Sequence, residues 1–353
     1  MRVAYDAGPV MGSPTGVGRY AGELARALEA RRIELHRYAV SLKASPRDDI
    51  EQMRFPATIV HQLWRVSGRP FPERLHKGCD LIHATNFVLP PTRVPGVLTV
   101  HDLSFHRDDV FPGGHRLRKL VPWSLERAAV AVVPTTAVGR ELEERHGFPG
   151  DRTVVTHEGV APVFFGASPL SDSVLGRMGI PGPFALAVGT IEPRKNLARL
   201  LEAWASVQGE LKGWRLVVAG PRGWGPELPE TPGVMPIGYV PEETLPGLMA
   251  AAEIFCYPSL YEGFGLPPLE AMAAGTACIA GRHPAAEEVL GEEAILVDPH
   301  RPDEIATALV RLAADDALRA RRALLGRSWA ARFTWEATAS ATIEAYERAL
   351  AHT

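Results

Sequence analysis

The sequence predicts an α/β protein with two doubly wound parallel sheets, one in each half of the chain, facing each other across a cleft. Its length of 353 residues suits two domains, since a typical domain has roughly 150 residues. Short apolar runs alternate with longer helical patterns, and this rhythm occurs twice. The 46% apolar and 22% charged content is ordinary for a soluble globular protein and excludes the disordered and fibrous classes.

The first half contains short apolar runs that we expect to form the strands of one parallel sheet. The predicted strands are Val3–Ala7, Ile33–Val40, Leu81–Ala84, Val97–Val100 and Val130–Val133. The clearest helical patterns between them are Gly18–Ala30 and Leu117–Ala128. Because parallel strands need long crossover connections, this alternation predicts a sheet covered by helices on both faces.

The second half repeats the pattern. Its predicted strands are Phe184–Val188, Trp214–Ala219, Ile254–Tyr257, Ala277–Ala280 and Ile295–Val297. Three helical patterns without strands follow at Asp303–Ala313, Ala317–Trp329 and Trp335–Ala351. We therefore predict an N-terminal Rossmann-like domain over 1–165, a linker rich in Gly, Pro and Ser over 166–183, and a second Rossmann-like domain over 184–333. The last helix, 334–353, either packs beside the second sheet or crosses back to the first domain.

Composition and charge indicate which kinds of partner the protein is expected to bind. A net charge of −3 gives no sign of a nucleic-acid surface. The N-terminal MRVAYDAG enters a strand without signal-peptide features, and no apolar run approaches the roughly 20 residues of a membrane span, so we expect a cytoplasmic protein. Cys79, Cys256 and Cys278 stand singly among apolar neighbours, which favours buried, reduced thiols over a metal site.

The most informative segment is YEGFGLPPLEAMAAG, Tyr261–Gly275. Glu262 precedes a turn with two glycines, the prolines Pro267-Pro268 suit the first turn of a helix, and Glu270 falls inside that helix. We expect amides at the helix N-terminus to point between the two glutamates, where an anion would bind. A glycosidase carboxylate pair is disfavoured, because eight helical residues would separate the two by about 12 Å, beyond the roughly 5 to 9.5 Å such pairs require.

A second candidate site follows the strand predicted at Phe184–Val188. In GTIEPRKN, two adjacent cations, Arg194 and Lys195, stand near the N-terminus of a predicted helix, where the helix dipole disfavours cations. An anionic ligand would resolve this conflict, and a forked Arg donor beside a mobile Lys suits a diphosphate. Solvated surface charge is the alternative for the pair taken alone.

Two further motifs lie in the first half. TVHDLSF places His101 and Asp102 at the end of a strand, where ligands bind in this architecture, although a structural histidine and a capping aspartate are alternatives. GVGRYA, Gly16–Ala21, formally satisfies the dinucleotide fingerprint. A loop separates it from its strand and Ser41 follows the second strand in place of an acid, so its glycines favour a ligand approach in the cleft over NAD binding.

One segment bears on membrane contact. HRLRKLVPW, His115–Trp123, mixes cations with apolar residues at helical spacing. Such a face suits an anionic membrane surface, and a solvated helix is the alternative.

With these motifs the chain resembles the retaining glycosyltransferases of family 4, which have the GT-B architecture of two facing Rossmann-like domains. The resemblance covers nearly the whole length. It implies that Glu270 binds the ribose of a nucleotide, that Glu262 contacts hydroxyls of the donor sugar, and that Arg194 and Lys195 neutralise the leaving diphosphate. His101 would meet the sugar or its phosphate.

The same match implies the remaining site positions. On the donor side these are Gly189, Gly263, Phe264, Gly265, Leu266, Tyr239 and Val240, and on the acceptor side Gly16, Gly18, Arg19 and Asp102. The chain departs from the family pattern at Thr190, where many members carry arginine, and at Glu158, where asparagine is usual.

The resemblance implies transfer of a hexose from a nucleoside-diphosphate sugar to a glycan or lipid-linked acceptor, with retention. GDP-mannose is the preferred donor because the sequence motifs EPRKN and HDLSF are similar to those of bacterial mannosyltransferases of polysaccharide or glycolipid assembly. The two cations would replace a metal ion, and no aspartate cluster suits Mg²⁺. A GT-B nucleotide-sugar epimerase and a noncatalytic nucleotide-sugar-binding subunit remain as alternatives.

Overall fold

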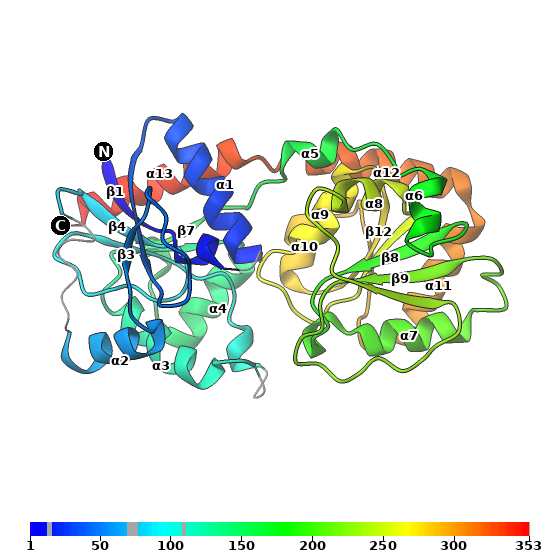
Figure 1. Cartoon of the computed structure of the whole chain (residues 1–353), viewed down its shortest axis with the longest axis horizontal. Coiled ribbons are helices and arrows are strands. Elements are labelled where there is room, and N and C mark those ends of the chain that lie inside the picture. The colour runs from blue at the N-terminus through cyan, green and yellow to red at the C-terminus, as the bar shows by residue number, and fades with distance from the viewer. Residues whose placement is uncertain (13–15, 69–76, 108–110, 353) are drawn as a thin grey trace. The chain divides into compact units, whose positions relative to one another are not determined.

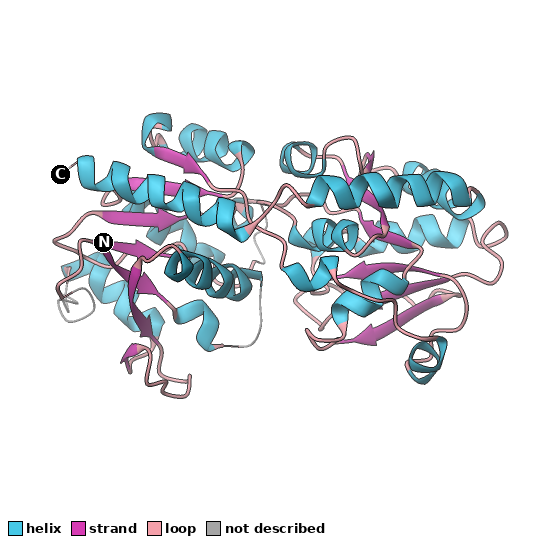
Figure 2. Cartoon of the chain, turned by 90° about the horizontal axis from the view of Figure 1, so that it is seen from above, coloured by secondary structure: helices cyan, strands magenta, loops and turns pink. Residues whose placement is uncertain are grey.

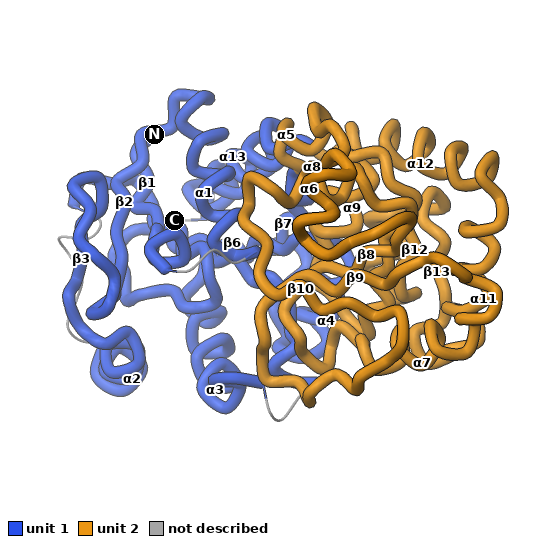
Figure 3. The backbone as a smooth tube through the Cα atoms, turned by 45° about the vertical axis from the view of Figure 1, so that its right-hand side comes forward, with its two compact units in different colours: residues 1–159, 334–353 blue, residues 160–333 orange. Residues whose placement is uncertain are grey.

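The computed structural model describes residues 1–12, 16–68, 77–107 and 111–352 (Figure 1). The chain divides into two compact units, unit 1 from residues 1–159 and 334–353, and unit 2 from residues 160–333 (Figure 3). Each unit contains one parallel sheet covered by helices on both faces, as the sequence predicts (Figure 2).

The sheet of unit 1 has the strand order β3-β2-β1-β4-β5-β6-β7, and all its pairs are parallel. Its strands are β1 Arg2–Asp6, β2 Glu34–Val40, β3 Glu51–Met53, β4 Leu81–Ala84, β5 Gly96–Thr99, β6 Val130–Val133 and β7 Thr153–Val155. Successive residues of β1 point to opposite faces, so Val3 and Tyr5 join one apolar cluster and Ala4 the other. This alternation places one core on each side of the sheet.

The helices of unit 1 cover these two cores. They are α1 Gly16–Ala30, α2 Ala57–Ser67, α3 Gly114–Leu125, α4 Thr136–His146 and α13 Trp335–Ala351, with short 3₁₀ turns η1 Gly8–Met11, η3 Ser104–His106 and η4 Gly150–Arg152. In α1 the buried positions Tyr20, Leu24 and Leu28 recur every four residues and form one apolar stripe. The C-terminal helix α13 packs against α1 and adds Tyr346 to the same core. The last helix therefore belongs to unit 1.

The sheet of unit 2 has the order β10-β9-β8-β11-β12-β13, again with parallel pairs. Its strands are β8 Phe184–Val188, β9 Arg215–Ala219, β10 Val234–Gly238, β11 Ile254–Tyr257, β12 Ala277–Gly281 and β13 Ile295–Val297. The helical elements are α5 Pro162–Phe165, α6 Asp172–Arg177, η5 Pro193–Lys195, α7 Leu197–Ser206, α8 Leu245–Ala251, α9 Leu266–Ala273, α10 Pro284–Leu290, α11 Pro302–Ala314 and α12 Asp316–Ala330. Residues of α7 and α11 fill one core, and residues of α8, α9 and α10 fill the other.

The predicted linker at 166–183 is wrong. The boundary between the units lies at residues 159 and 160, and the segment 166–183 belongs to unit 2. The Gly, Pro and Ser residues of this segment form turns around the short helix α6. Leu175 and Ile180 anchor the segment in the apolar core. Gly159 lies so close to the returning chain that a Cβ there would meet the backbone nitrogen of Trp335 at 2.3 Å.

Two sequence predictions on composition can be compared with the structure. Cys79, Cys256 and Cys278 are buried and form no disulfide. None of the helices in the described part of the chain combines the length and the apolar character needed to cross a bilayer.

Candidate functional site

The two most informative motifs meet at one edge of the unit 2 sheet. Strands β8 and β11 are hydrogen-bonded neighbours, so the segments after their carboxyl ends, 189–196 and 258–262, lie at the same edge. The backbone joins them directly, since the Leu260 N–H donates to the Arg194 carbonyl at 2.9 Å. Residues separated by more than sixty positions in the sequence thus form one site.

Four charged side chains make up what we call the ion-pair cluster: Glu192, Arg194, Lys195 and Glu262. Arg194 bonds Glu192 through Nη2 at 2.7 Å and through Nε at 3.0 Å, and its Nη1 donates to Glu262 Oε2. Lys195 Nζ donates to Glu262 Oε1 at 2.8 Å and also to the Tyr257 hydroxyl. Glu262 therefore holds both cations at once.

These pairs correct part of the sequence argument. Arg194 and Lys195 lie in the 3₁₀ turn η5, before α7 begins at Leu197, and their charges are balanced by Glu192 and Glu262. A ligand is thus not needed to explain why two cations stand here. Glu192 lies between the glycine and the cations in GTIEPRKN, but the sequence reasoning missed its role.

Burial and charge act in opposite directions on the cluster. Burial raises the pKa of Glu262, but the adjacent Arg194 and Lys195 outweigh it and lower that pKa to about 2. Burial and the neighbouring Arg194 guanidinium lower the pKa of Lys195, while Glu262 and Glu192 act to raise it. Since the four formal charges cancel, an arriving anion would compete with the glutamates for the cations.

Backbone geometry fixes these side chains. Gly189 has φ +148° at the end of β8, and Gly220, at φ +147°, approaches so closely that a Cβ there would lie 2.0 Å from the Gly189 carbonyl oxygen. Asn196, in the left-handed region at φ +59°, donates through Nδ2 to the carbonyls of Pro258 at 3.0 Å and Pro299 at 2.6 Å. The turn carrying the cations is therefore tied to the loop carrying Glu262.

The glutamate segment adopts the expected turn and helix. Helix α9 begins at Leu266 after Gly265, which has φ +99°, and Gly275 at φ +87° follows its end. Glu270 is buried in the second turn, with 2% of its surface exposed. Because Pro267 and Pro268 lack an N–H, the first three helical positions offer one amide, that of Leu266. The helix end thus offers fewer amides to an anion than the sequence analysis expects.

Three other predicted donor-side residues differ in exposure. The Phe264 ring packs edge-on against Phe333, with ring centroids 5.9 Å apart, so its backbone and not its ring is available. Tyr239 follows β10 and is 56% exposed, and Val240 packs against the apolar core of unit 2. Tyr239 thus offers an accessible aromatic ring near the end of an edge strand.

His283 is a site residue that the sequence reasoning missed. It follows β12, and its Nδ1 accepts from the Ala286 amide at 3.2 Å, capping α10. Burial lowers its pKa to about 4, against an opposing effect of Glu262, which places the ring within electrostatic range of the cluster. The motif GRHP could have indicated this residue, because it places a polar side chain after a strand and directly before the proline that begins a helix.

In unit 1, His101 lies at the end of β5 among aromatic rings. Its Nε2 donates to the Thr85 carbonyl at 2.8 Å, since a carbonyl oxygen can only accept. Its Nδ1 lies 3.8 Å from Glu158 Oε1, and the Tyr20 ring packs edge-on against the imidazole at 4.8 Å. The family departure at Glu158 thus faces the histidine that the sequence singled out.

The remaining predicted acceptor-side residues also belong to unit 1. Asp102 accepts from the Ser104 amide at 2.9 Å and the Ser104 hydroxyl at 2.7 Å, which is the capping role considered as an alternative. Helix α1 begins at Gly16, which is exposed, whereas Gly18 is buried and Arg19 is half-buried. The turn η1 separates this glycine pair from β1, as the argument against NAD requires.

Within the residues that the structure describes, no three His, Cys, Asp or Glu side chains gather closely enough to hold a metal ion.

The structure has the two-domain GT-B fold, with one Rossmann-like parallel sheet in each unit. In structure the chain is similar to sucrose-phosphate synthase from Thermosynechococcus elongatus, with a TM-score of 0.78, 21% identity and all of both chains covered. It is also similar to HepE of Anabaena solved with UDP and glucose, with a TM-score of 0.76, 17% identity, and 98% and 99% of the two chains covered.

Sequence comparison identifies the family. The model of Glycosyltransferase Family 4 matches residues 14–163, and that of Glycosyl transferases group 1 matches residues 182–315. O-antigen chain mannosyltransferase B of Escherichia coli is 30% identical over 98% of this chain and 100% of its own length. The chain belongs to glycosyltransferase family 4 and is similar to its mannosyltransferases.

Proposed function

We propose that this protein transfers a mannosyl residue from GDP-mannose to a glycan or lipid-linked acceptor, with retention of the anomeric configuration and without a metal ion. The observation that carries the proposal is the ion-pair cluster, which holds two cations at the carboxyl edge of a parallel sheet, the edge where such folds bind ligands. The mannosyl preference rests on the relatives, among them the O-antigen chain mannosyltransferase of Escherichia coli.

The chemistry follows from charge. Breaking the sugar–phosphate bond leaves negative charge on the diphosphate, and fixed cations at that position lower the barrier most. We expect the diphosphate of the donor to bind Arg194 and Lys195 in place of Glu262. The carboxylate of Glu262 is then free to accept hydrogen bonds from hydroxyls of the donor sugar. The acceptor hydroxyl attacks on the side of the leaving group, and its proton passes to the departing phosphate oxygen. No separate protein base is then required.

A panel of nucleotide sugars tests the proposal. The protein is incubated with each donor in the presence and absence of a mannose-terminated glycan and of EDTA, and nucleoside diphosphate and product are quantified by mass spectrometry. We expect GDP release from GDP-mannose that depends on the acceptor, an α-linked product by NMR, and no effect of EDTA. Turnover that EDTA abolishes would contradict the metal-free mechanism, and epimer formation without acceptor would favour an epimerase.

Glu270 is predicted to contact the ribose. We expect Glu270→Gln to raise the KM for GDP-mannose about tenfold, with a smaller change in kcat, because the amide loses one hydrogen bond from a ribose hydroxyl to a carboxylate. The substitution should have little effect on binding of a GDP analogue that lacks both ribose hydroxyls. Glu287→Gln, an exposed position on α10, is the matched control. If Glu270→Gln lowered the affinity for GDP and for the analogue equally, the ribose contact would be contradicted.

We also propose that unit 1 binds the cytoplasmic face of an anionic membrane through α2 and α3, which we call the basic apolar face. Four apolar side chains before and along α2 are 46–71% exposed: Phe55, Ile59, Leu63 and Val66. Helices α2 and α3 pack against each other, and neither contains Asp or Glu, whereas together they carry Arg65, Arg116, Arg118 and Lys119. Exposed apolar residues on helices that carry basic but no acidic side chains suit the interface of an anionic bilayer.

Vesicle sedimentation tests this face. The protein should sediment with vesicles of phosphatidylcholine and phosphatidylglycerol. It should bind vesicles of phosphatidylcholine alone at least about tenfold more weakly. Leu63→Ser combined with Val66→Ser should weaken the retention about tenfold without affecting folding, since both side chains are exposed. Leu324→Ser, at an exposed position of unit 2, should leave it unchanged. Retention that is insensitive to the double substitution would contradict the proposal.

A further inference from the structure

Tyr257 is the last residue of β11, and its hydroxyl contacts the ion-pair cluster. The side chain is buried, with 5% of its surface exposed, and its ring stacks on Phe255 with the ring centroids 6.2 Å apart. The Lys195 ammonium donates a hydrogen bond to the Tyr257 hydroxyl. Because the ring is packed in the apolar core of unit 2, this hydroxyl is a fixed point of the fold.

Lys195 therefore has two partners of different charge. Glu262 accepts from Nζ at 2.8 Å and is an anion, because Arg194 and Lys195 outweigh the effect of burial and lower its pKa to about 2. The Tyr257 hydroxyl is neutral, because burial and then the nearby Glu262 carboxylate raise the pKa of Tyr257 well above its usual value. Nζ has three N–H donors, so it can bond both groups at once.

The two partners differ in what happens when the donor binds. In the proposed function the diphosphate binds Lys195 in place of Glu262, because the two anions compete for the same ammonium. A lysine side chain has a flexible stem, so an ammonium without an anchor would regain conformational freedom. Groups that stabilise developing charge act best when they are fixed before the reaction. A neutral hydroxyl can keep one N–H of Lys195 while the diphosphate binds the others.

We propose that Tyr257 is a positioning residue for mannosyl transfer, whose hydroxyl holds the Lys195 ammonium in place when the donor diphosphate replaces Glu262. The inference rests on the proposed function, in which Lys195 neutralises the diphosphate. It adds to the ion-pair cluster a neutral group that lies outside the motifs GTIEPRKN and EGFGLPPLE.

Tyr257→Phe removes the hydroxyl and keeps the buried ring that packs on Phe255. With saturating acceptor we expect it to lower kcat about tenfold, the loss of one hydrogen bond to a charged group. The KM for GDP-mannose should change by less than about twofold, because the charge of Lys195 still attracts the diphosphate and only its position is less well fixed. Initial rates over a range of GDP-mannose concentrations give both values.

A double-mutant cycle separates an effect through Lys195 from a general loss of structure. If the hydroxyl acts by holding Lys195, Tyr257→Phe added to Lys195→Ala should leave kcat within about twofold of Lys195→Ala alone. A further loss as large as that seen in the wild-type background would mean that the hydroxyl acts without Lys195, and it would overturn the proposal.

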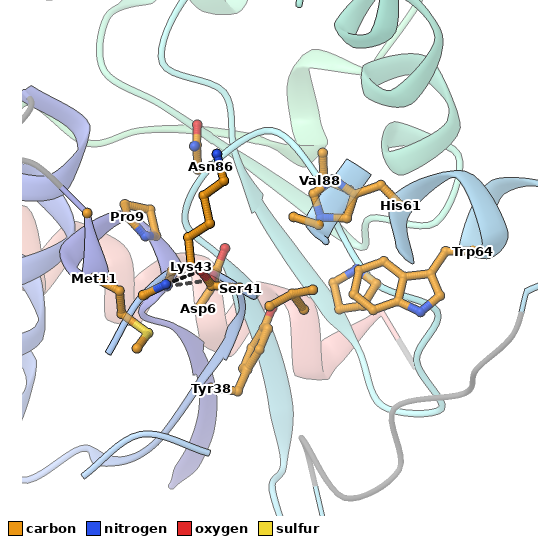
Figure 4. A pocket seen from close by; sticks show the side chains of 16 residues that line it. Asp6, Pro9, Met11, Tyr38, Ser41, Lys43, His61, Trp64, Asn86 and Val88 are labelled. Carbon is orange, nitrogen blue, oxygen red and sulfur yellow. Dashed lines mark hydrogen bonds between the residues drawn. The ribbon is translucent and has the colours of Figure 1, made fainter. Parts of the chain in front are cut away.

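Two tyrosines of unit 1 provide matched controls. The Tyr5 hydroxyl is buried and donates to the Ala21 carbonyl at 2.7 Å, so Tyr5→Phe also removes a hydrogen-bonded hydroxyl. Tyr38 lies at a pocket of unit 1 (Figure 4), and its buried hydroxyl has no hydrogen-bond partner among the described residues. Both variants should keep kcat within about twofold of wild type. A loss in Tyr5→Phe equal to that in Tyr257→Phe would show that removing any buried hydroxyl is enough, against the proposal.

The pKa of Lys195 gives a readout that needs no transfer activity. A hydrogen bond from the ammonium to a hydroxyl stabilises the protonated form, so Tyr257→Phe should lower the pKa of Lys195 below its wild-type value. Carbon-13 NMR of protein labelled at lysine Cε measures this pKa, and Lys195→Ala assigns the signal. A lowered pKa in a protein without mannosyl transfer would refute the proposed function and leave the Tyr257 contact standing. An unchanged pKa, or an unchanged kcat in a protein that transfers mannose, would overturn the proposal.

Discussion

Lys195→Ala and Arg194→Ala should each lower kcat for mannosyl transfer by about 10²- to 10³-fold, the loss typical when one fixed group that stabilises developing negative charge is removed. Both cations are held by Glu262, so they are positioned before any substrate arrives. Lys195→Arg should recover part of the loss, since it restores the charge but not the compact ammonium that fits beside Tyr257. Initial rates with saturating GDP-mannose give the measurement.

The matched control for these substitutions is Lys212→Ala. Lys212 is an exposed lysine just before β9, at the opposite edge of the same sheet, so its loss removes a charge without touching the cluster. We expect its kcat to stay within about twofold of wild type. Comparable rates for Lys195→Ala, Arg194→Ala and Lys212→Ala would contradict a catalytic role for the cations.

Glu262→Gln should lower the free energy of unfolding at pH 7 by about 2 to 4 kcal/mol, because it leaves two largely buried cations without their shared carboxylate. The pKa of Glu262 falls from 4.5 to about 2 on folding. A lowered folded-state pKa corresponds to about 3 kcal/mol of stability that is fully present above pH 4.5. It is lost as the pH falls from 4.5 through 2, when the carboxyl takes up its proton.

Urea unfolding followed by tryptophan fluorescence measures this effect. The difference between wild type and Glu262→Gln should be largest at pH 7 and should narrow steadily below pH 4.5. Glu202→Gln, an exposed position on α7, should match wild type at every pH. A stability difference of the same size at pH 7 and pH 2.5 would show that the carboxylate charge is not what holds the cluster.

Strand patterns in the sequence predicted the sheets well because buried parallel strands are continuous apolar runs. Val130–Val133, Phe184–Val188 and Ile254–Tyr257 have the bounds that the sequence predicts. Strands β3 and β7 were missed: each has three residues, as does the predicted β13, but β3 lacks an apolar run and β7 follows directly on the turn η4. Strand β10 was missed because it contains a proline and a glycine, which within strands are largely confined to edges and irregular positions.

Part of the candidate site could be predicted from the motifs GTIEPRKN and EGFGLPPLE, although the two cations lie in η5 and not in the helix that follows it. Arg194, Lys195 and Glu262 were found this way, and the structure brings the three together. Glu192 and His283 were missed because their importance depends on which loops meet at the sheet edge, and that follows from strand order.

The domain boundary was misplaced for a related reason. Turn-forming residues at 166–183 resemble a linker, but a linker differs from an ordered loop by what its apolar residues contact. Leu175 and Ile180 enter the core of unit 2, and a contact of this kind leaves no local pattern in the sequence.

Calorimetric titration of GDP into the full-length protein in EDTA tests the central claim most directly. If the cations after β8 take the diphosphate, Arg194→Ala and Lys195→Ala should each bind GDP at least about tenfold more weakly than wild type, while Lys212→Ala binds as wild type does. Equal GDP affinities in all four proteins, or GDP binding that requires a divalent cation, would contradict it.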